Sequence, residues 1–175
     1  MTKQILITLW LGGLLAVSSR AAEDRIMAPV NPARTVSLPR HVHPRTRLSA
    51  DLGPVDPEAP IEGVIALFKP AAGLDALLAS QQIPGTPDYR RWLTPEEFGA
   101  RFGASDGDLA RVRGWIEAQG LRVNRIARGR MYIEFSGPAG RLGRALHTSF
   151  RHYEIGGRKH FANSSDSEIQ KRWRR

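Results

Sequence analysis

LTPEEFGARFGASDGDLARVRGWIEAQG, residues 93–120, decides the fold, because it contains two consecutive helix start signals. In the first signal, Thr94 can cap a helix, Pro95 takes the first helical position, and Glu97 completes a capping box. The two positions of a hydrophobic staple around this cap are also apolar, and they hold Leu93 and Phe98. We therefore predict a short helix that begins directly after Thr94.

The second signal starts a longer helix. Gly103 ends the first helix, Ser105 repeats the cap with Asp108 three residues later, and Gly120 can supply a left-handed stop. An apolar face follows the helical spacing, and it consists of Leu109, Val112 and Ile116. This face should pack against a sheet.

Strand patterns surround these helices. After residue 120 the apolar residues alternate with polar ones, which is typical of half-buried strands, and residues 127–130 form a turn between two of them. The predicted strands lie at residues 61–68, 121–123, 131–135 and 150–155, and two shorter helices lie around residues 74–78 and 137–146. Gly156-Gly157 should turn the chain back after the last strand.

The order of elements is strand, helices, strand, strand, helix, strand. It predicts an α+β fold of the ferredoxin-like split β-α-β type, with a four-stranded antiparallel sheet and helices on one face. Residues 83–103 form a helical insertion in this scheme. The predicted domain occupies residues 60–163.

Residues 1–21 have the composition of a secretory signal peptide. Lys3 is the positive start, an apolar run of 13 residues extends from Ile5 to Val17, and Ser19 and Ala21 are small. A bilayer core of about 30 Å needs roughly 20 helical residues, so we expect no stable membrane anchor. We predict cleavage after Ala21 and a secreted or periplasmic location.

The segments that flank the predicted domain are polar or rich in proline. Residues 22–59 contain repeated prolines and no sustained apolar period, which predicts a tether. His41 and His43 lie in it without a third ligand at a usual spacing, so we expect no metal site there. Residues 164–175 form a predicted basic polar tail.

Composition excludes several kinds of chemistry. The chain of 175 residues has no cysteine, so disulfides, cysteine-zinc sites and cysteine nucleophiles are absent. It contains no Gly-x-Ser-x-Gly elbow, no glycine-rich phosphate loop and no His-Glu-x-x-His pattern. Glu96 and Glu97 fit a helix cap, and we expect surface or interface roles for His147, His152 and His160. We therefore predict no catalytic, metal-binding or cofactor-binding residue.

An ordered series of motifs runs between residues 89 and 163. The residues that carry it are Tyr89, Trp92, Leu93, Thr94, Glu96, Glu97 and Phe98, then Phe102, Gly103, Ser105, Val112, Trp115, Ile116, Gly120 and Leu121, and finally Ile133–Gly137, Ala145–Thr148, Tyr153, Gly157 and Phe161–Asn163. From about residue 52 to residue 163 the chain resembles the activation domain of the sedolisin/kumamolisin serine-carboxyl peptidases.

This resemblance implies a ferredoxin-like propeptide that inhibits, and assists the folding of, a sedolisin-type peptidase catalytic domain. That domain carries the catalytic Glu, Asp and Ser of the family, and no part of this sequence resembles it, so we expect no enzyme activity from the chain itself. A stand-alone inhibitor and a non-functional fragment of a split precursor both remain open. We predict partner contacts at an exposed sheet face and beyond it, at Tyr132, Tyr153, Phe161 and Asn163.

A basic RNA-binding domain is the rival interpretation. The formal net charge is +9, and residues 128–135 partly fit the stacking motif of RNA-recognition domains. The fit fails at Arg130 and Met131, where the motif needs an aromatic and a small residue. A secretion signal also argues against RNA, so we expect no nucleic-acid partner.

Overall fold

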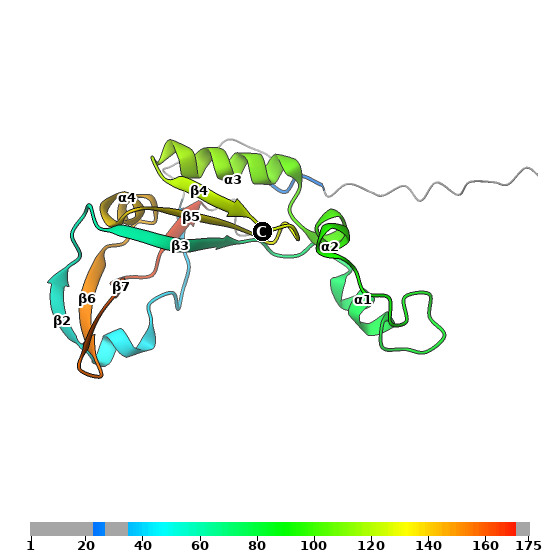
Figure 1. The fold of residues 1–175 in the computed structure, drawn as a ribbon, viewed down its shortest axis with the longest axis horizontal. Helices are drawn as coiled ribbons and strands as arrows, with labels where there is room; N and C mark the ends of the chain where they lie inside the picture. Colours follow the sequence, from blue (N-terminus) through cyan, green and yellow to red (C-terminus); the bar gives the residue numbers. More distant parts are fainter. Residues whose placement is uncertain (1–22, 27–34, 171–175) are drawn as a thin grey trace, which may run out of the picture.

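The computed structural model describes residues 23–26 and 35–170 (Figure 1). The predicted signal peptide and its cleavage site at Ala21 lie outside the described residues. In the described part, no helix is long and apolar enough to cross a membrane.

The structure is mixed α and β, as the sequence predicts. Its helices are α1 (Leu74–Ser80), α2 (Pro95–Phe102), α3 (Asp106–Ala118), α4 (Ala139–Ala145) and the short 3-10 helix η1 (Pro44–Leu48). Its strands are β1 (Thr35–Ser37), β2 (Ala50–Pro54), β3 (Pro60–Leu67), β4 (Arg122–Ile126), β5 (Tyr132–Pro138), β6 (Phe150–Ile155), β7 (Arg158–Asn163) and β8 (Glu168–Gln170).

The strands form three small antiparallel sheets instead of one four-stranded sheet. Their orders are β3-β5-β4, β2-β6-β7 and β1-β8. The fourth predicted strand, β6, pairs with β2 along one edge and with β7 along the other, so that Arg151 lies opposite both Pro54 and Ala162. Both edges of β6 are therefore used, and the ferredoxin-like four-stranded sheet is not confirmed.

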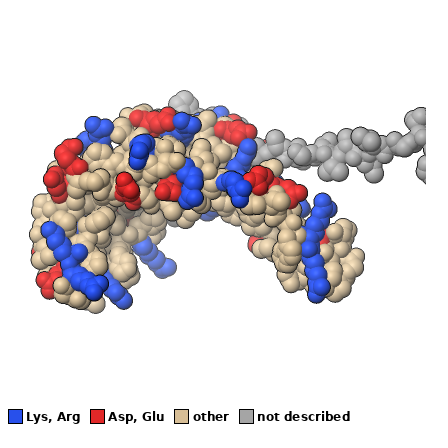
Figure 2. All heavy atoms as spheres, in the orientation of Figure 1, with Lys and Arg blue, Asp and Glu red and all other residues tan. Residues whose placement is uncertain are grey.

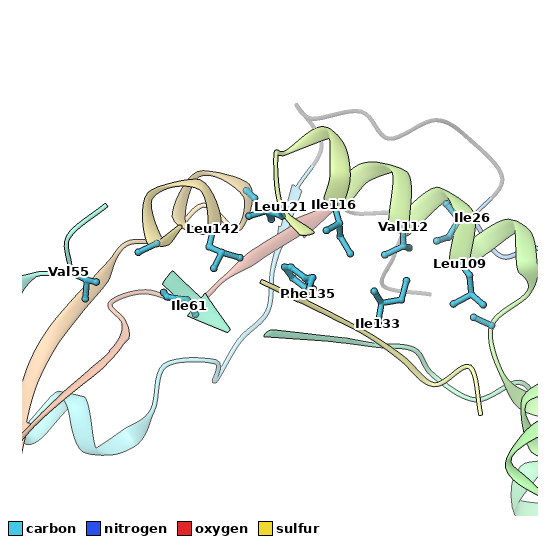
Figure 3. Packing of buried hydrophobic residues seen from close by; sticks show 13 residues of the cluster. Ile26, Val55, Ile61, Leu109, Val112, Ile116, Leu121, Ile133, Phe135 and Leu142 are labelled. Atoms are coloured by element: carbon cyan, nitrogen blue, oxygen red, sulfur yellow. The ribbon is translucent and has the colours of Figure 1, made fainter. Parts of the chain in front are cut away.

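Helix α3 covers one face of the β3-β5-β4 sheet and forms the centre of the core. Val112 and Ile116 point from the helix towards Phe135 and Ile133 of β5 (Figure 3). Ile116 and Ile133 are completely buried. The predicted apolar face of this helix is confirmed, and it fixes which face of the sheet stays uncovered.

The predicted helix caps are also confirmed. Thr94 Oγ1 accepts a hydrogen bond from the Glu97 N–H, and the Glu97 carboxylate accepts one from the Thr94 N–H. This backbone hydrogen bond from Thr94 lowers the pKa of Glu97. The Asp108 N–H donates to Ser105 Oγ, and Gly120 has the left-handed backbone expected of a helix stop.

Residues 22–59, predicted as a tether, contain β1, η1 and β2 in the described part. Two of its prolines lie where they cost little, Pro44 in the first turn of η1 and Pro54 at the end of β2. The Asp166 carboxylate accepts hydrogen bonds from three successive backbone N–H groups, those of Arg40, His41 and Val42. These long-range contacts fix the conformation of a segment whose sequence has no helical or strand period. The domain boundary at residue 59 stays a prediction.

The predicted tail also takes part in the fold. Residues 168–170 form β8, which pairs with β1, and the Glu168 N–H donates to the carbonyl of Leu146. The two predicted flanking segments thus pair with each other.

A short N-terminal strap, residues 23–26, is attached to the start of α3. The Asp108 carboxylate accepts hydrogen bonds from the backbone N–H groups of Arg25 and Ile26 at 2.8–3.1 Å. Asp24 accepts a hydrogen bond from Ser105 Oγ at 2.6 Å and pairs with Arg111 at 2.8 Å. The strap adds Ile26 to the core.

Candidate functional site

The molecule has the outline of an arch (Figure 2). The β3-β5-β4 sheet forms its middle, with α3 on the convex side, and α1 and the β2-β6-β7 sheet extend from its two ends on the other side (Figure 1). The sheet face opposite α3 therefore looks into the hollow of the arch.

Strand alternation determines which side chains occupy this uncovered face. Val64, Ala66 and Phe68 pack against the core under α3. The residues between them must point to the opposite side. Strand pairing places Leu67 opposite Tyr132, and Glu134 between Ile65 and Arg125. We call this set, Ile65, Leu67, Arg125, Tyr132 and Glu134, the open sheet face.

The open sheet face combines apolar area with a paired charge. Ile65 is 51% exposed and Leu67 is 78% exposed. Arg125 donates to the Glu134 carboxylate at 2.9 Å and lies over the Tyr132 ring at 5.5 Å. Exposed aliphatic side chains beside an ordered Arg–aromatic pair are typical of protein-binding surfaces.

The same geometry disfavours stacking of RNA bases on this face. Tyr132 is the aromatic residue of the open sheet face, and Arg125 already lies over its ring. The neighbouring positions on β3 hold Ile65 and Leu67, which offer no ring for a second base.

The four predicted contact residues differ in accessibility. Tyr132 lies on the open sheet face, and Phe161 is exposed on β7. Tyr153 belongs to the other three-stranded sheet and is 7% exposed. The Asn163 amide donates to the carbonyls of His41 and Ser165, so it fastens the chain after β7. The structure does not bring the four side chains onto one surface.

His152 and His160, two of the histidines with an expected surface or interface role, are also separated. His152 lies opposite Phe161 in the β6–β7 pair, whereas His160 lies opposite Tyr153. Adjacent positions of a strand point to opposite faces, so His152 and His160 lie on different faces of the sheet. Among the described residues, no three His, Asp or Glu side chains are arranged to hold a metal ion.

Ser105, Ser136 and Ser164 have partners that suit structure better than catalysis. Ser105 Oγ donates to Asp24, Ser136 Oγ donates to Asn124 at 3.0 Å, and Ser164 Oγ lies 2.6 Å from Ser149 Oγ. A serine nucleophile needs an adjacent general base, normally a histidine. None of these hydrogen bonds, all between described residues, involves one.

A cavity of about 390 Å³ lies between α3, β3 and the β1–β8 pair. Its wall is mainly apolar and includes Val64, Phe68, Val112 and Trp115. The Arg25 and Asp108 side chains at its edge are already engaged, Arg25 with the carbonyl of Lys69 and Asp108 with the strap. The cavity reaches the outer edge of β3, where Ile65 and Leu67 also line it.

Comparison of the sequence with known families and proteins identifies relatives of this chain. The family model described as "Pro-kumamolisin, activation domain" matches residues 48–172. The chain belongs to this family. The match begins beside β2 and includes both three-stranded sheets, which confirms the resemblance stated from the motifs.

Two curated relatives agree with this membership. The activation domain is 30% identical to xanthomonalisin from Xanthomonas sp. (strain T-22) over 109 residues, which are 62% of this chain and 13% of the relative. It is 29% identical to kumamolisin from Bacillus sp. (strain MN-32) over 119 residues, which are 67% of this chain and 21% of the relative. The chain thus corresponds to about a fifth or less of either protein.

Sequence reasoning missed the two largest apolar contributions to the open sheet face. The run Ile61–Phe68 has no clear alternation, so it suggests a strand that is buried on both sides. The strand could have been oriented through its partner β5, in which the alternation is clear. Ile133 and Phe135 of β5 face the core, so the β3 residues paired with them also face the core and Ile65 and Leu67 face the other side.

Proposed function

We propose that this activation domain is a secreted, non-catalytic inhibitor and folding chaperone of a sedolisin-type peptidase domain. The family match over residues 48–172 is the observation that supports this function. The relatives contain this region as a minor part of a much longer chain, as expected of a propeptide. The peptidase domain is the proposed partner, whether it is supplied in trans or comes from a split precursor.

We place the principal contact on the open sheet face. Ile65 and Leu67 supply apolar area that α3 does not cover, and Tyr132 extends it along β5. Phe161 is proposed as a second direct contact because it is exposed. For Tyr153 and Asn163 we propose a supporting role, because the first is buried and the second fastens the chain after β7.

Inhibition in trans tests this function. The full chain is titrated against the mature peptidase part of xanthomonalisin, and we expect inhibition that Leu67→Asp weakens by at least tenfold. Leu48→Asp is the matched control, because Leu48 is also highly exposed but lies in η1. No inhibition by the wild-type chain at micromolar concentration would reject the proposed function.

The chain alone should hydrolyse no peptide substrate between about pH 3 and 8, because Ser105, Ser136 and Ser164 form hydrogen bonds with Asp24, Asn124 and Ser149 and not with a histidine base. Turnover by the purified chain that is abolished by Ser105→Ala, Ser136→Ala or Ser164→Ala would contradict this proposal.

The proposed export depends on residues 1–21. Expression of the full chain in a secreting host should give a product whose first residue follows Ala21. Retention of the intact N-terminus in the cytoplasm would contradict secretion.

A further inference from the structure

The arm, residues 74–93, consists of α1 and the loop that follows it, and it projects from the sheet in Figure 1. Helix α2 is its base and packs closely on the β4–β5 turn. A Cβ atom added at Gly99 would lie 2.7 Å from the carbonyl oxygen of Arg128, which shows how near the two backbones are. The Ala71 N–H also donates to the carbonyl of Phe102. These contacts hold α2 and residue 71, on either side of the arm, against the rest of the molecule.

The loop of the arm has a defined shape that buried polar groups maintain. Gln81 is 4% exposed, and its side-chain amide donates to the backbone carbonyl of Arg91. The backbone carbonyl of Gln81 accepts a hydrogen bond from the Arg90 N–H. Thr86 Oγ1 donates to the carbonyl of Ser80 at 2.6 Å. Fully satisfied buried polar groups specify one conformation. Arg90 is held in a left-handed backbone conformation that non-glycine residues rarely adopt, and such strain is typical of functional loops.

This ordered loop exposes apolar side chains instead of burying them. Trp92 is 68% exposed. Of the nine large hydrophobic side chains that are exposed in the described part of the chain, four belong to the arm, and they are Leu78, Ile83, Tyr89 and Trp92. A concentration of this kind on a projecting, hydrogen-bonded loop marks a binding surface, and Trp and Tyr are frequent energetic centres of protein interfaces.

The charge next to these side chains indicates the chemistry of the partner. Arg90 lies over the Tyr89 ring at 5.2 Å, and Arg91 is exposed beside Trp92. Among the described residues Arg90 forms no salt bridge, whereas Arg91 has Glu97 as an acidic neighbour and adds, after the hydrogen bonds from Thr94, to the lowering of the Glu97 pKa. An apolar surface that carries carboxylates would complement both the rings and the two cations.

We propose that the arm is a second contact site for the peptidase domain, where Trp92 enters an apolar, acid-lined patch while the open sheet face binds elsewhere on the same partner. The arm forms one end of the arch and the open sheet face lines its hollow, so a partner that fills the hollow can reach both (Figure 1, Figure 2). This inference rests on the proposed function.

The test compares variants of the full chain as inhibitors of the mature peptidase part of xanthomonalisin. We expect Trp92→Ala to raise the inhibition constant about tenfold or more. Gln81→Ala should weaken inhibition too, because it releases the loop without altering the open sheet face. Leu48→Ala is the control, and circular dichroism checks that every variant keeps its fold.

The outcomes separate the two proposals. If the wild-type chain inhibits and Trp92→Ala inhibits equally well, the arm is not a contact and the proposed function stands. If the wild-type chain does not inhibit, both proposals fail. Co-sedimentation of the chain with phosphatidylglycerol vesicles that is lost in Trp92→Ala would overturn the inference in favour of a membrane surface.

Discussion

At the scale of single residues, Asp108 does more in the structure than the sequence predicts. It is predicted only as part of a helix cap, but its carboxylate is 2% exposed and holds the N-terminal strap through the N–H groups of Arg25 and Ile26. One side chain therefore joins segments that are more than 80 residues apart in the sequence. No local pattern could reveal this contact.

We expect Asp108→Asn to lower the free energy of unfolding by about 1–3 kcal/mol, because the side chain keeps only one acceptor oxygen, turns an NH2 group towards the Arg25 N–H and loses the charge that faces Arg25 and Arg111. Asp106→Asn is the matched control. Asp106 lies in the same helical turn but is 84% exposed, and its ion pair with Arg130 should be worth about 0–1 kcal/mol. Urea denaturation measures both variants. Equal losses would show that the strap adds nothing to stability.

The strap should also make stability depend on pH. The hydrogen bond from Ser105, followed by that from Arg111, lowers the pKa of Asp24 below its usual value. A carboxyl with a lowered pKa stabilises the folded state above its unfolded pKa of about 4, and this contribution is lost as the pH falls through the folded value. Between pH 6 and 2.5, the wild-type chain should therefore lose more stability than Asp24→Asn. Parallel curves of unfolding free energy against pH would contradict this expectation.

At the scale of helices and strands, features that depend on nearby residues could be predicted. The cap of α2, the apolar face of α3 and the stop at Gly120 each depend on residues within a few turns of one another. The pairing of β6 with β2, and of β8 with β1, depends on contacts across about 100 residues or more. Weak local patterns such as those of β1 and β8 become strands only because the fold brings them together.

The attachment of α2 to the β4–β5 turn gives a prediction at this scale. In an exposed helix interior, Gly→Ala normally stabilises by about 1 kcal/mol. At Gly99 the added methyl group would clash with the backbone oxygen of Arg128, so we expect a loss of about 1–3 kcal/mol. At Gly114 in α3 nothing lies within 4 Å of the added Cβ, so Gly114→Ala should stabilise. Thermal denaturation measures both variants, and stabilisation by Gly99→Ala would mean that α2 is not held against the turn.

At the scale of the whole molecule, positive charge and an arched shape suit a partner that is acidic where the two meet. Removal of residues 1–21 would take away two basic residues and no acidic one, which leaves a formal charge of +7. The two surfaces proposed for binding both combine apolar side chains with arginine, namely Arg125 on the open sheet face and Arg90 and Arg91 on the arm. Apolar contact provides affinity, while the charges favour one orientation of the partner.

This arrangement predicts that acid weakens inhibition. Arginine stays protonated at every pH of interest, whereas the partner's carboxylates, with ordinary pKa values of about 4, lose their charge in acid. The inhibition constant should therefore change little from about pH 7 to 5 and rise steeply between about pH 4.5 and 3, and high salt should reduce the difference. The measurement is the inhibition constant against pH at two salt concentrations, with tryptophan fluorescence to confirm that the chain stays folded at each pH. A constant that is flat from pH 6 to 3 and indifferent to salt would mean that Ile65, Leu67 and Trp92 supply the binding energy and that the arginines only keep the surface solvated.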